Sequence, residues 1–135
     1  MCRRVTALVP LLAASALLAQ PPADKVIPAA EAGTYLNRQV VVEMLVRASK
    51  DEKPREVFYL DSERDYRDKK NFAVVIAYRD LGAFKKAGVT DPSAFYKGKK
   101  IRVRGKVTFD EKEKQVQLHV QSPAQIQVVE DAPKK

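Results

Sequence analysis

A run of alternating apolar and charged residues within Tyr96–Val107 constrains the fold of this chain more than any other stretch. Its apolar members are Ile101, Val103 and Val107, and its charged members are Arg102, Arg104 and Lys106. Because successive side chains of a strand point to opposite faces, the alternation predicts a β-strand with one buried and one solvated face. Gly98 provides freedom for a turn before this strand, and Gly105 inside it predicts a bulge or a bend.

The same pattern occurs 61 residues earlier, in Tyr35–Val46. At this constant offset Tyr35 aligns with Tyr96, Asn37 with Gly98, and Val42 with Val103. Asparagine is the residue other than glycine that most readily adopts the left-handed conformation, so Asn37 can form the turn that Gly98 forms. Met44 stands where the later copy has Gly105, so the bend is not shared. We therefore expect both strands to begin after the same kind of turn.

The remaining elements follow from hydrophobic period and turn residues. Strands are predicted over Gln39–Ser49, Val57–Leu60, Phe72–Tyr78, the basic stretch after Gly98, Gln115–Val120 and Gln125–Val128. Short helical segments are predicted over Ile27–Gly33, Asp80–Gly88 and Thr90–Phe95. Phe72–Tyr78 is apolar on both faces and should be a central, doubly covered strand. Asp61–Lys70 is almost wholly polar and is predicted to be an exposed turn.

Three strands, a helix and two strands form the order of the OB-fold, a five-stranded Greek-key barrel. The predicted fold class is therefore all-β, with one short helix between strands three and four and a short helical turn at the N-terminus. The last short strand, Gln125–Val128, would follow the barrel.

Several motifs resemble the small secreted OB-fold domains of bacterial exported proteins. They are Val40-Val41-Val42, the run Phe72 to Ile76 before a short helix, the run Gly98 to Val107, Gln117 to Val120, and Ser122-Pro123-Ala124-Gln125-Ile126. The resemblance covers roughly Val26 to Val129 and implies a bacterial source and a shape similar to nucleic-acid-binding OB domains. Asn37 and Met44 depart from the glycines that this family carries around its first strand.

The first nineteen residues are typical of a secretory signal. Arg3 and Arg4 precede an apolar stretch from Val5 to Leu18, which is short for a bilayer span, and Ala19 is a small residue at the expected cut. Cleavage after Ala16 and an uncleaved membrane anchor are the alternatives. The predicted organisation is a signal peptide over 1–19, a linker over 20–26, an OB-fold domain over 27–129 and a disordered tail over 130–135.

The sequence offers little chemistry for catalysis. The only cysteine, Cys2, precedes the apolar stretch, so the mature chain would lack disulfides, thiolate nucleophiles and cysteine metal ligands. His119 is the only histidine and is expected on the solvated face of its strand. The carboxylates of Asp61–Asp68 have a spacing that admits a calcium loop, but neighbouring cations favour a salt-bridged loop. We predict a protein that is not an enzyme, with no catalytic residue, no metal site and no cofactor.

The charge of the chain indicates a polyanionic ligand, with solubility alone as the other explanation. The net charge is +8, and removal of Arg3 and Arg4 with the signal leaves +6. On the predicted basic strand alternate cations stand about 6–7 Å apart, a spacing close to that of phosphates in an extended single strand. The candidate ligand-binding residues are Tyr59, Tyr78, Lys99, Arg102, Arg104 and Lys106, with the tyrosines as stacking surfaces. In the alternative arrangement, Glu43 pairs with Arg102 or Arg104.

The predicted function is an exported OB-fold binding module for an anionic ligand, single-stranded nucleic acid being the foremost example. The alternative is a cell-envelope structural or stress adaptor that binds protein or glycan. In either case we expect a periplasmic or extracellular monomer with no stable membrane span once the signal is removed.

Overall fold

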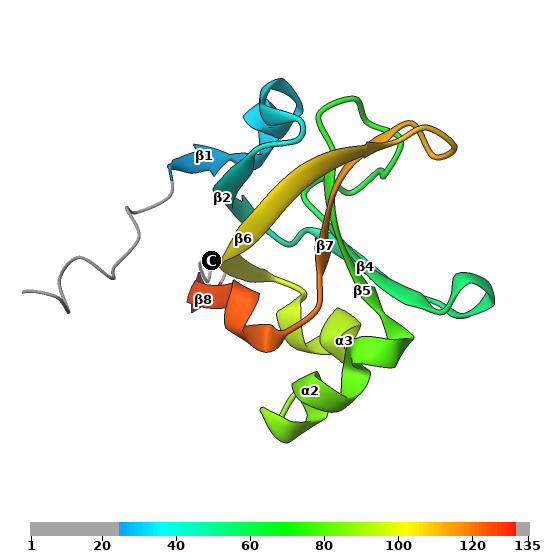
Figure 1. The fold of residues 1–135 in the computed structure, drawn as a ribbon. Helices are drawn as coiled ribbons and strands as arrows, with labels where there is room; N and C mark the ends of the chain where they lie inside the picture. Colours follow the sequence, from blue (N-terminus) through cyan, green and yellow to red (C-terminus); the bar gives the residue numbers. More distant parts are fainter. Residues whose placement is uncertain (1–24, 132–135) are drawn as a thin grey trace, which may run out of the picture.

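The computed structural model describes residues 25–131, which form a small β-barrel with helical segments at its ends (Figure 1). The strands are β1 (Val26–Pro28), β2 (Gln39–Leu45), β3 (Ala48–Glu52), β4 (Val57–Asp61), β5 (Phe72–Ala77), β6 (Lys99–Asp110), β7 (Gln115–Val120) and β8 (Ile126–Asp131). The helical segments are η1 (Ala29–Tyr35), η2 (Lys53–Arg55), η3 (Tyr78–Asp80), α2 (Leu81–Lys86), α3 (Pro92–Tyr96) and η4 (Pro123–Gln125). The predicted signal peptide over 1–19 lies outside the described residues. Within the described range, no helix has the length and apolar character needed to cross a bilayer.

The strands form one mixed sheet in the order β1-β2-β6-β7-β5-β4-β3, with β8 paired to β6 beside this path. The β1–β2 and β5–β7 pairs are parallel, and the other pairs are antiparallel. Two consecutive residues, Val46 and Arg47, lead from the β2–β6 pair to the β3–β4 pair and so close the barrel. Val46 N donates to Lys99 O at the start of β6 (2.9 Å), and Arg47 N donates to Asp61 O at the end of β4 (3.0 Å). This connectivity confirms the OB-fold, a partly open Greek-key barrel.

The strand count is higher than the predicted five for two reasons. The first predicted strand, Gln39–Ser49, divides at Val46 and Arg47 into β2 and β3, because the chain changes pairing partner there. In addition, β1 was not predicted as a strand and pairs with β2, and β8, which corresponds to the predicted last strand Gln125–Val128, pairs with β6 beside the barrel. Val26 belongs to the predicted linker, but in the structure it is part of β1 and pairs with Val41 of β2. At the other end, the backbone of β8 runs two residues past the predicted domain end at Val129.

The two copies of the repeat found in the sequence are related in the structure by a local pseudo-two-fold axis between β2 and β6. In the antiparallel register Val42 lies opposite Val103, its own equivalent at the 61-residue offset. Asn37 and Gly98, which precede the two strands, have φ angles of 66° and 83°, so both predicted left-handed turns are confirmed. The two turns also bond to equivalent partners. Asn37 N donates to Val107 O (2.6 Å) and Val107 N to Arg38 O (3.1 Å), as Gly98 N donates to Val46 O (2.8 Å) and Val46 N to Lys99 O (2.9 Å).

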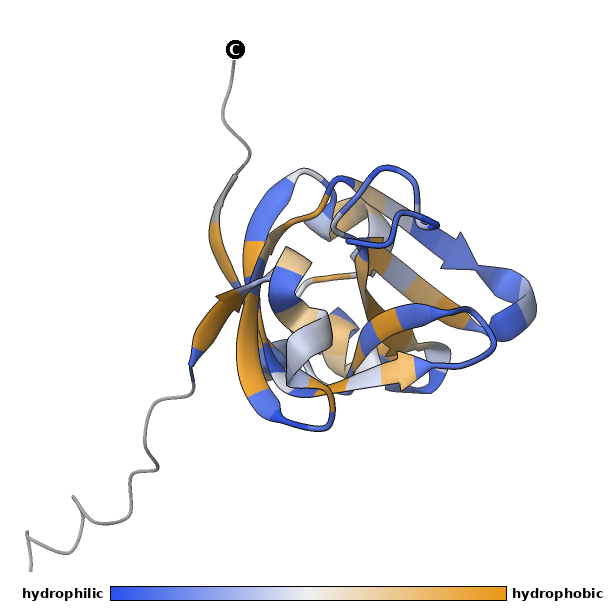
Figure 2. Ribbon diagram, turned by 90° about the horizontal axis from the view of Figure 1, so that it is seen from above, coloured by the Kyte–Doolittle hydropathy of each residue, from blue (hydrophilic) through white to orange (hydrophobic). Residues whose placement is uncertain are grey.

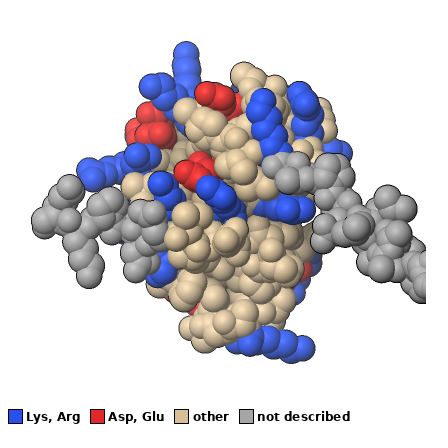
Figure 3. Space-filling model, turned by 90° about the vertical axis from the view of Figure 1, so that its left-hand side faces the viewer, with Lys and Arg blue, Asp and Glu red and all other residues tan. Residues whose placement is uncertain are grey.

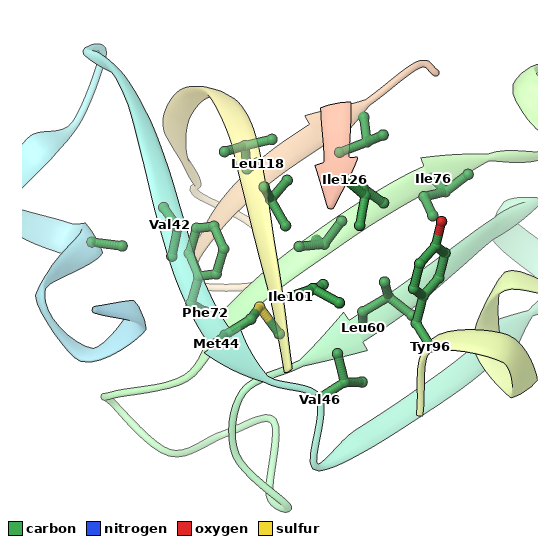
Figure 4. Packing of buried hydrophobic residues seen from close by; sticks show 14 of the residues in the cluster. Val42, Met44, Val46, Leu60, Phe72, Ile76, Tyr96, Ile101, Leu118 and Ile126 are labelled. Atoms are coloured by element: carbon green, nitrogen blue, oxygen red, sulfur yellow. The ribbon is translucent and has the colours of Figure 1, made fainter. Parts of the chain in front are cut away.

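Side chains from seven strands, all except β3, form the hydrophobic core, part of which Figure 4 shows. The labelled residues of this core are Val42, Met44, Val46, Leu60, Phe72, Ile76, Tyr96, Ile101, Leu118 and Ile126. β5 lies between β4 and β7, and its first five residues are buried, which confirms the prediction of a central strand covered on both faces. Figure 2 shows hydrophobic strand segments and hydrophilic connecting loops around this core.

α2 and α3 lie together at one end of the barrel (Figure 1). They contribute Phe84 and Tyr96, which are 0% and 3% exposed, to the core. α3 begins with Pro92 at its first turn, and Asp91 Oδ1 accepts hydrogen bonds from the N–H groups of Ser93 and Ala94. An aspartate at this cap stabilises a short helix because it satisfies N–H groups that have no partner within the helix.

The loop between β4 and β5 corrects one prediction, because its ends are buried rather than exposed. Asp61, Ser62 and Asn71 are 7%, 2% and 3% exposed. Asn71 connects the two ends of the loop, because its Nδ2 donates to Asp61 Oδ1 (3.0 Å) and its Oδ1 accepts from Glu63 N (2.9 Å). Gln115 is also buried, with its Nε2 donating to Tyr66 O (3.2 Å), so this loop covers part of the face of β7 that was predicted to be solvated.

Candidate nucleic-acid interface

The outward face of β6 carries four cations, which we call the basic strip: Lys100, Arg102, Arg104 and Lys106. Between them Ile101 and Val103 point inward and are fully buried, so the predicted alternation of this strand is confirmed. Figure 3 shows the side of the molecule that carries β1, β2 and β8, where basic side chains are grouped with acidic ones among them. The strip is therefore an exposed surface of mixed, mainly positive charge.

Glu43 of β2 neutralises part of the basic strip. It lies opposite Arg102 in the register, and its Oε1 accepts from Arg102 Nε at 2.9 Å, while its Oε2 is 3.7 Å from Lys100 Nζ. The arrangement that pairs Glu43 with Arg102 is thus the observed one. Both cations keep about two-fifths of their side-chain surface exposed, so solvent weakens the pairing and leaves both charges within reach of a ligand.

A shallow pocket of about 210 Å³ continues the strip at its Lys100 end, and we call it the basic pocket. Its lining consists of Leu45, Val46, Arg47, Arg64, Lys97 and Gly98. Leu45 pairs with Lys100 across β2 and β6, which places the pocket next to the strip. Arg47 is held in position because its Nη1 donates to Ser62 O (2.7 Å) and lies 3.9 Å from Glu63. Arg64 and Lys97 form no ion pair within the described part of the chain.

A second pocket, which we call the β4 cavity, lies on the face of the barrel formed by β3 and β4. It has a volume of about 200 Å³ and is lined by Lys50, Glu52, Arg55, Tyr59, Asp61, Tyr66, Glu113 and Gln115. Lys50 pairs with Glu52 at 2.8 Å, and Arg55 of η2 pairs with Glu113 of the β6–β7 hairpin at 2.5 Å. The hydrogen bond from Lys50 lowers the pKa of Glu52, and the bond to Glu113 raises the pKa of Arg55. With three carboxylates and two cations, this cavity is unsuited to phosphate.

The six predicted ligand-binding residues do not converge. Arg102, Arg104 and Lys106 share the basic strip, but Tyr59 lines the β4 cavity, and β7 and β5 separate β4 from β6 in the sheet. Tyr78 packs on Phe58 with ring centroids 5.1 Å apart. Its hydroxyl donates to Asp51, which raises the pKa of Tyr78 to about 12.

Lys99 also lies apart from the strip. Its Nζ donates to Phe95 O (2.8 Å) and lies 4.5 Å from the centroid of the Phe95 ring. Lys99 therefore links the end of α3 to β6, and its ammonium group contacts α3. The ligand-binding set predicted from the sequence leaves out Arg47, Arg64 and Lys97, which three separate segments bring to one pocket.

The acidic loop after β4 is held by ion pairs and turn hydrogen bonds. Asp65 contacts Arg67 at 3.1 Å, which lowers the pKa of Asp65, and Asp68 Oδ1 accepts from Lys70 N (2.9 Å). His119 is exposed on β7 as predicted. Within the described residues, no three His, Cys, Asp or Glu side chains are grouped so that they would hold a metal ion.

Comparison with solved structures relates this barrel to domains of aminoacyl-tRNA synthetases. Aspartyl-tRNA synthetase from Entamoeba histolytica matches with a TM-score of 0.53 and 16% identity over 83% of this chain and 23% of that chain. Asparaginyl-tRNA synthetase from the same organism, in complex with asparaginyl-adenylate, matches with a TM-score of 0.53 and 11% identity over 84% of this chain and 25% of that chain. Asparaginyl-tRNA synthetase from Pyrococcus horikoshii matches with a TM-score of 0.50 and 15% identity over 81% of this chain and 24% of that chain.

This chain spans about a quarter of the length of those solved structures. No protein-family model matches the sequence, and no curated protein matches it either. At identities of 11% to 16% the likeness is one of backbone geometry. The comparison therefore shows the fold of the chain, which is an OB-fold barrel.

Proposed function

We propose that this protein is an exported OB-fold module that binds single-stranded nucleic acid along the basic strip and the basic pocket. The observation that carries the proposal is the pocket itself. Arg64 and Lys97 line it together with Arg47, although neither forms an ion pair with another described residue. Charges of like sign are brought together at a cost, and an anionic ligand would offset that cost.

The geometry of β6 fits an extended phosphate backbone. Alternate residues of a strand are separated by about 6–7 Å, which approximates the separation of phosphates in an extended single strand. Arg102 and Arg104 would lie along such a backbone, and the basic pocket would bind its continuation past Lys100. Because the cations of the strip alternate with buried apolar residues, base stacking contributes little on this surface, and phosphate contacts dominate. We therefore expect little sequence preference.

The fold comparison supports this proposal. The synthetases that share the barrel are named for tRNA, a polyanion, so the fold is compatible with such a ligand. The charges of the proposed face come from β6, from Arg64 in the β4–β5 loop and from Lys97.

The test is fluorescence anisotropy of a labelled oligothymidine titrated with the mature protein over a series of salt concentrations. We expect log K to fall linearly with log salt concentration, with a slope of about −0.7 for each phosphate contact on single strands. The double variant Arg64→Gln/Lys97→Gln should weaken binding and reduce the size of the slope by about 1.4, since two contacts are lost. The matched control is Lys85→Gln/Lys86→Gln, which removes the same charge from exposed positions on α2.

Two results would contradict the proposal. An absence of binding at low salt would remove nucleic acid as the ligand and leave the envelope adaptor that binds protein or glycan. An equal loss of affinity in the α2 control would show that only net charge matters and that the basic pocket is not a site.

Export is proposed from the sequence of residues 1–19 and has its own test. Mass spectrometry of the protein purified from its native host should show a chain that begins at Gln20. A chain that retains Met1 would contradict cleavage and favour the uncleaved anchor.

A further inference from the structure

The β4 cavity contains one carboxylate that no cation neutralises. Glu52 is paired with Lys50 and Glu113 with Arg55, but Asp61 forms no ion pair with any described residue. Its side chain lines the cavity although the residue is only 7% exposed. Asn71 Nδ2 donates to Asp61 Oδ1 at 3.0 Å, and no donor among the described residues reaches Oδ2. Half of this buried carboxylate therefore lacks a protein partner.

A buried acceptor without a donor is costly, and such groups in folded proteins normally have a partner. The lining of the cavity as a whole carries three carboxylates against two cations, so its field favours a positive ligand. The rings of Tyr59 and Tyr66 also line it, and aromatic rings attract cations. We propose that the β4 cavity binds a small organic cation, with a primary ammonium or guanidinium group donating to Asp61 Oδ2.

The size and the charge of the cavity limit what it can hold. Its volume of about 200 Å³ is below the roughly 300–1,000 Å³ of pockets for drug-sized ligands, so the ligand is a small molecule or the end of a chain. A phosphate would meet three carboxylates there. The cavity shares no lining residue with the basic pocket, so this site and the nucleic-acid surface are separate and of opposite preference.

Binding requires the ionised form of Asp61, and the surroundings of this group give the binding a pH dependence. Burial raises the pKa of Asp61, while the hydrogen bond from Asn71 acts in the opposite direction. The other charged and titratable groups around the cavity are Lys50 and Glu52 on β3, Arg55 on η2, Tyr59 on β4, Tyr66 in the following loop and Glu113 in the β6–β7 hairpin. As pH falls through the raised pKa, Asp61 takes up a proton and the affinity for a cation should fall.

The test is calorimetric titration of the full protein with ethylammonium chloride and with methylguanidinium chloride at millimolar concentrations. Methylurea serves as the neutral probe of similar shape. We expect one cation to bind per chain, at least tenfold tighter than methylurea, and Asp61→Asn to weaken it at least tenfold. Asp61→Asn keeps an oxygen that accepts from Asn71, and Glu111→Gln is the control, since it removes one negative charge from an exposed position in the neighbouring hairpin.

The outcomes separate this proposal from the nucleic-acid one. Three results would each overturn the cation site. They are an unchanged cation affinity in Asp61→Asn, an affinity for methylurea equal to that for the cations, and no detectable binding of either cation. If Asp61→Asn does not fold, loss of binding to the wild-type protein as pH falls tests the same role of Asp61, and a flat profile would contradict it. Arg64→Gln/Lys97→Gln should keep its cation affinity, and Asp61→Asn should keep its affinity for oligothymidine, so either proposal can fail alone.

Discussion

The turn that leads into β2 and the turn that leads into β6 share a backbone and differ in charge. Asn37 and Gly98 both have positive φ angles, and their N–H groups donate to equivalent carbonyls, that of Val107 in β6 and that of Val46 just after β2. The outward residues that follow do not correspond, since Val41 and Glu43 of β2 align with the two arginines Arg102 and Arg104 of β6. The comparison teaches that turn geometry and buried valines specify the barrel, whereas the charge belongs to one copy only. Fold and ligand preference are thus separable on the same pair of strands.

The largest expected effect comes from the position where the two copies differ inside the barrel. A Cβ at Gly105 would lie 2.8 Å from Leu118 Cδ2, and Leu118 is fully buried. Gly105→Ala should therefore destabilise the protein by about 1–3 kcal/mol through overpacking. At the equivalent position of β2, Met44→Leu conserves volume and should cost less than about 1.5 kcal/mol. Urea denaturation measures both, and a neutral Gly105→Ala would show that Leu118 moves aside freely.

The two turns can be compared by exchanging their residues. No atom lies within 4 Å of a Cβ added at Gly98, so Gly98→Ala loses stability only through its φ of 83°, by about 1–2 kcal/mol. Gly98→Asn installs the residue of the other copy and should cost less, because asparagine tolerates this conformation. Thermal unfolding of the two variants ranks them. If Gly98→Ala and Gly98→Asn lost the same stability, asparagine would have no advantage over alanine at this turn, in contrast to its use at position 37.

The difference in charge between the two copies is tested at Glu43 of β2, which lies opposite Arg102 of β6. Glu43→Gln should change the free energy of unfolding by less than about 1 kcal/mol, because the pairing is half-exposed. Release of Arg102 and Lys100 should raise affinity for oligothymidine by up to about fivefold, the equivalent of roughly 1 kcal/mol. Anisotropy at fixed salt measures this, with Glu111→Gln as the control of equal charge change. The same gain in both variants would contradict a role for the strip.

The smallest effect is expected from the aligned cations Arg38 and Lys99. The guanidinium carbon of Arg38 lies 5.3 Å from the Tyr35 ring centroid, and Lys99 Nζ lies 4.5 Å from that of Phe95. Arg38→Met should cost about 0.5 kcal/mol, and Lys99→Met up to about 1 kcal/mol, because Lys99 also loses a hydrogen bond to Phe95 O. Urea denaturation compares the pair. A larger loss for Arg38→Met would reverse the order that the contacts predict.

Much of the barrel was predictable because its signals are local. Alternation in β6, the doubly apolar β5 and the left-handed Asn37 are properties of short segments, and the structure confirms each of them. β1 was not predictable, because three residues carry no period and their pairing partner in β2 is parallel and distant in sequence. The burial of Asp61 and Gln115 was missed for a related reason. Both are polar, and only the tertiary path of the β4–β5 loop covers them.

The candidate sites were less predictable than the fold. The basic strip lies on one strand and was visible in the sequence, but the basic pocket draws Arg47, Arg64 and Lys97 from three segments that meet only in the folded chain. The predicted partnership of Tyr59 with Arg102 failed because the order of strands in the sheet places β7 and β5 between them. Residue types alone do not determine such distances.

The change of partner between Val46 and Arg47 makes the barrel a cooperative ring. These adjacent amides bond to two strands that are not neighbours in the sheet, to Lys99 of β6 and to Asp61 of β4, so two consecutive peptide groups hold both halves of the barrel together. Neither half can separate locally without the loss of one of these bonds and the exposure of Val46, which is fully buried. The two amide hydrogens should therefore exchange with solvent only through global unfolding, and rank among the slowest in the protein.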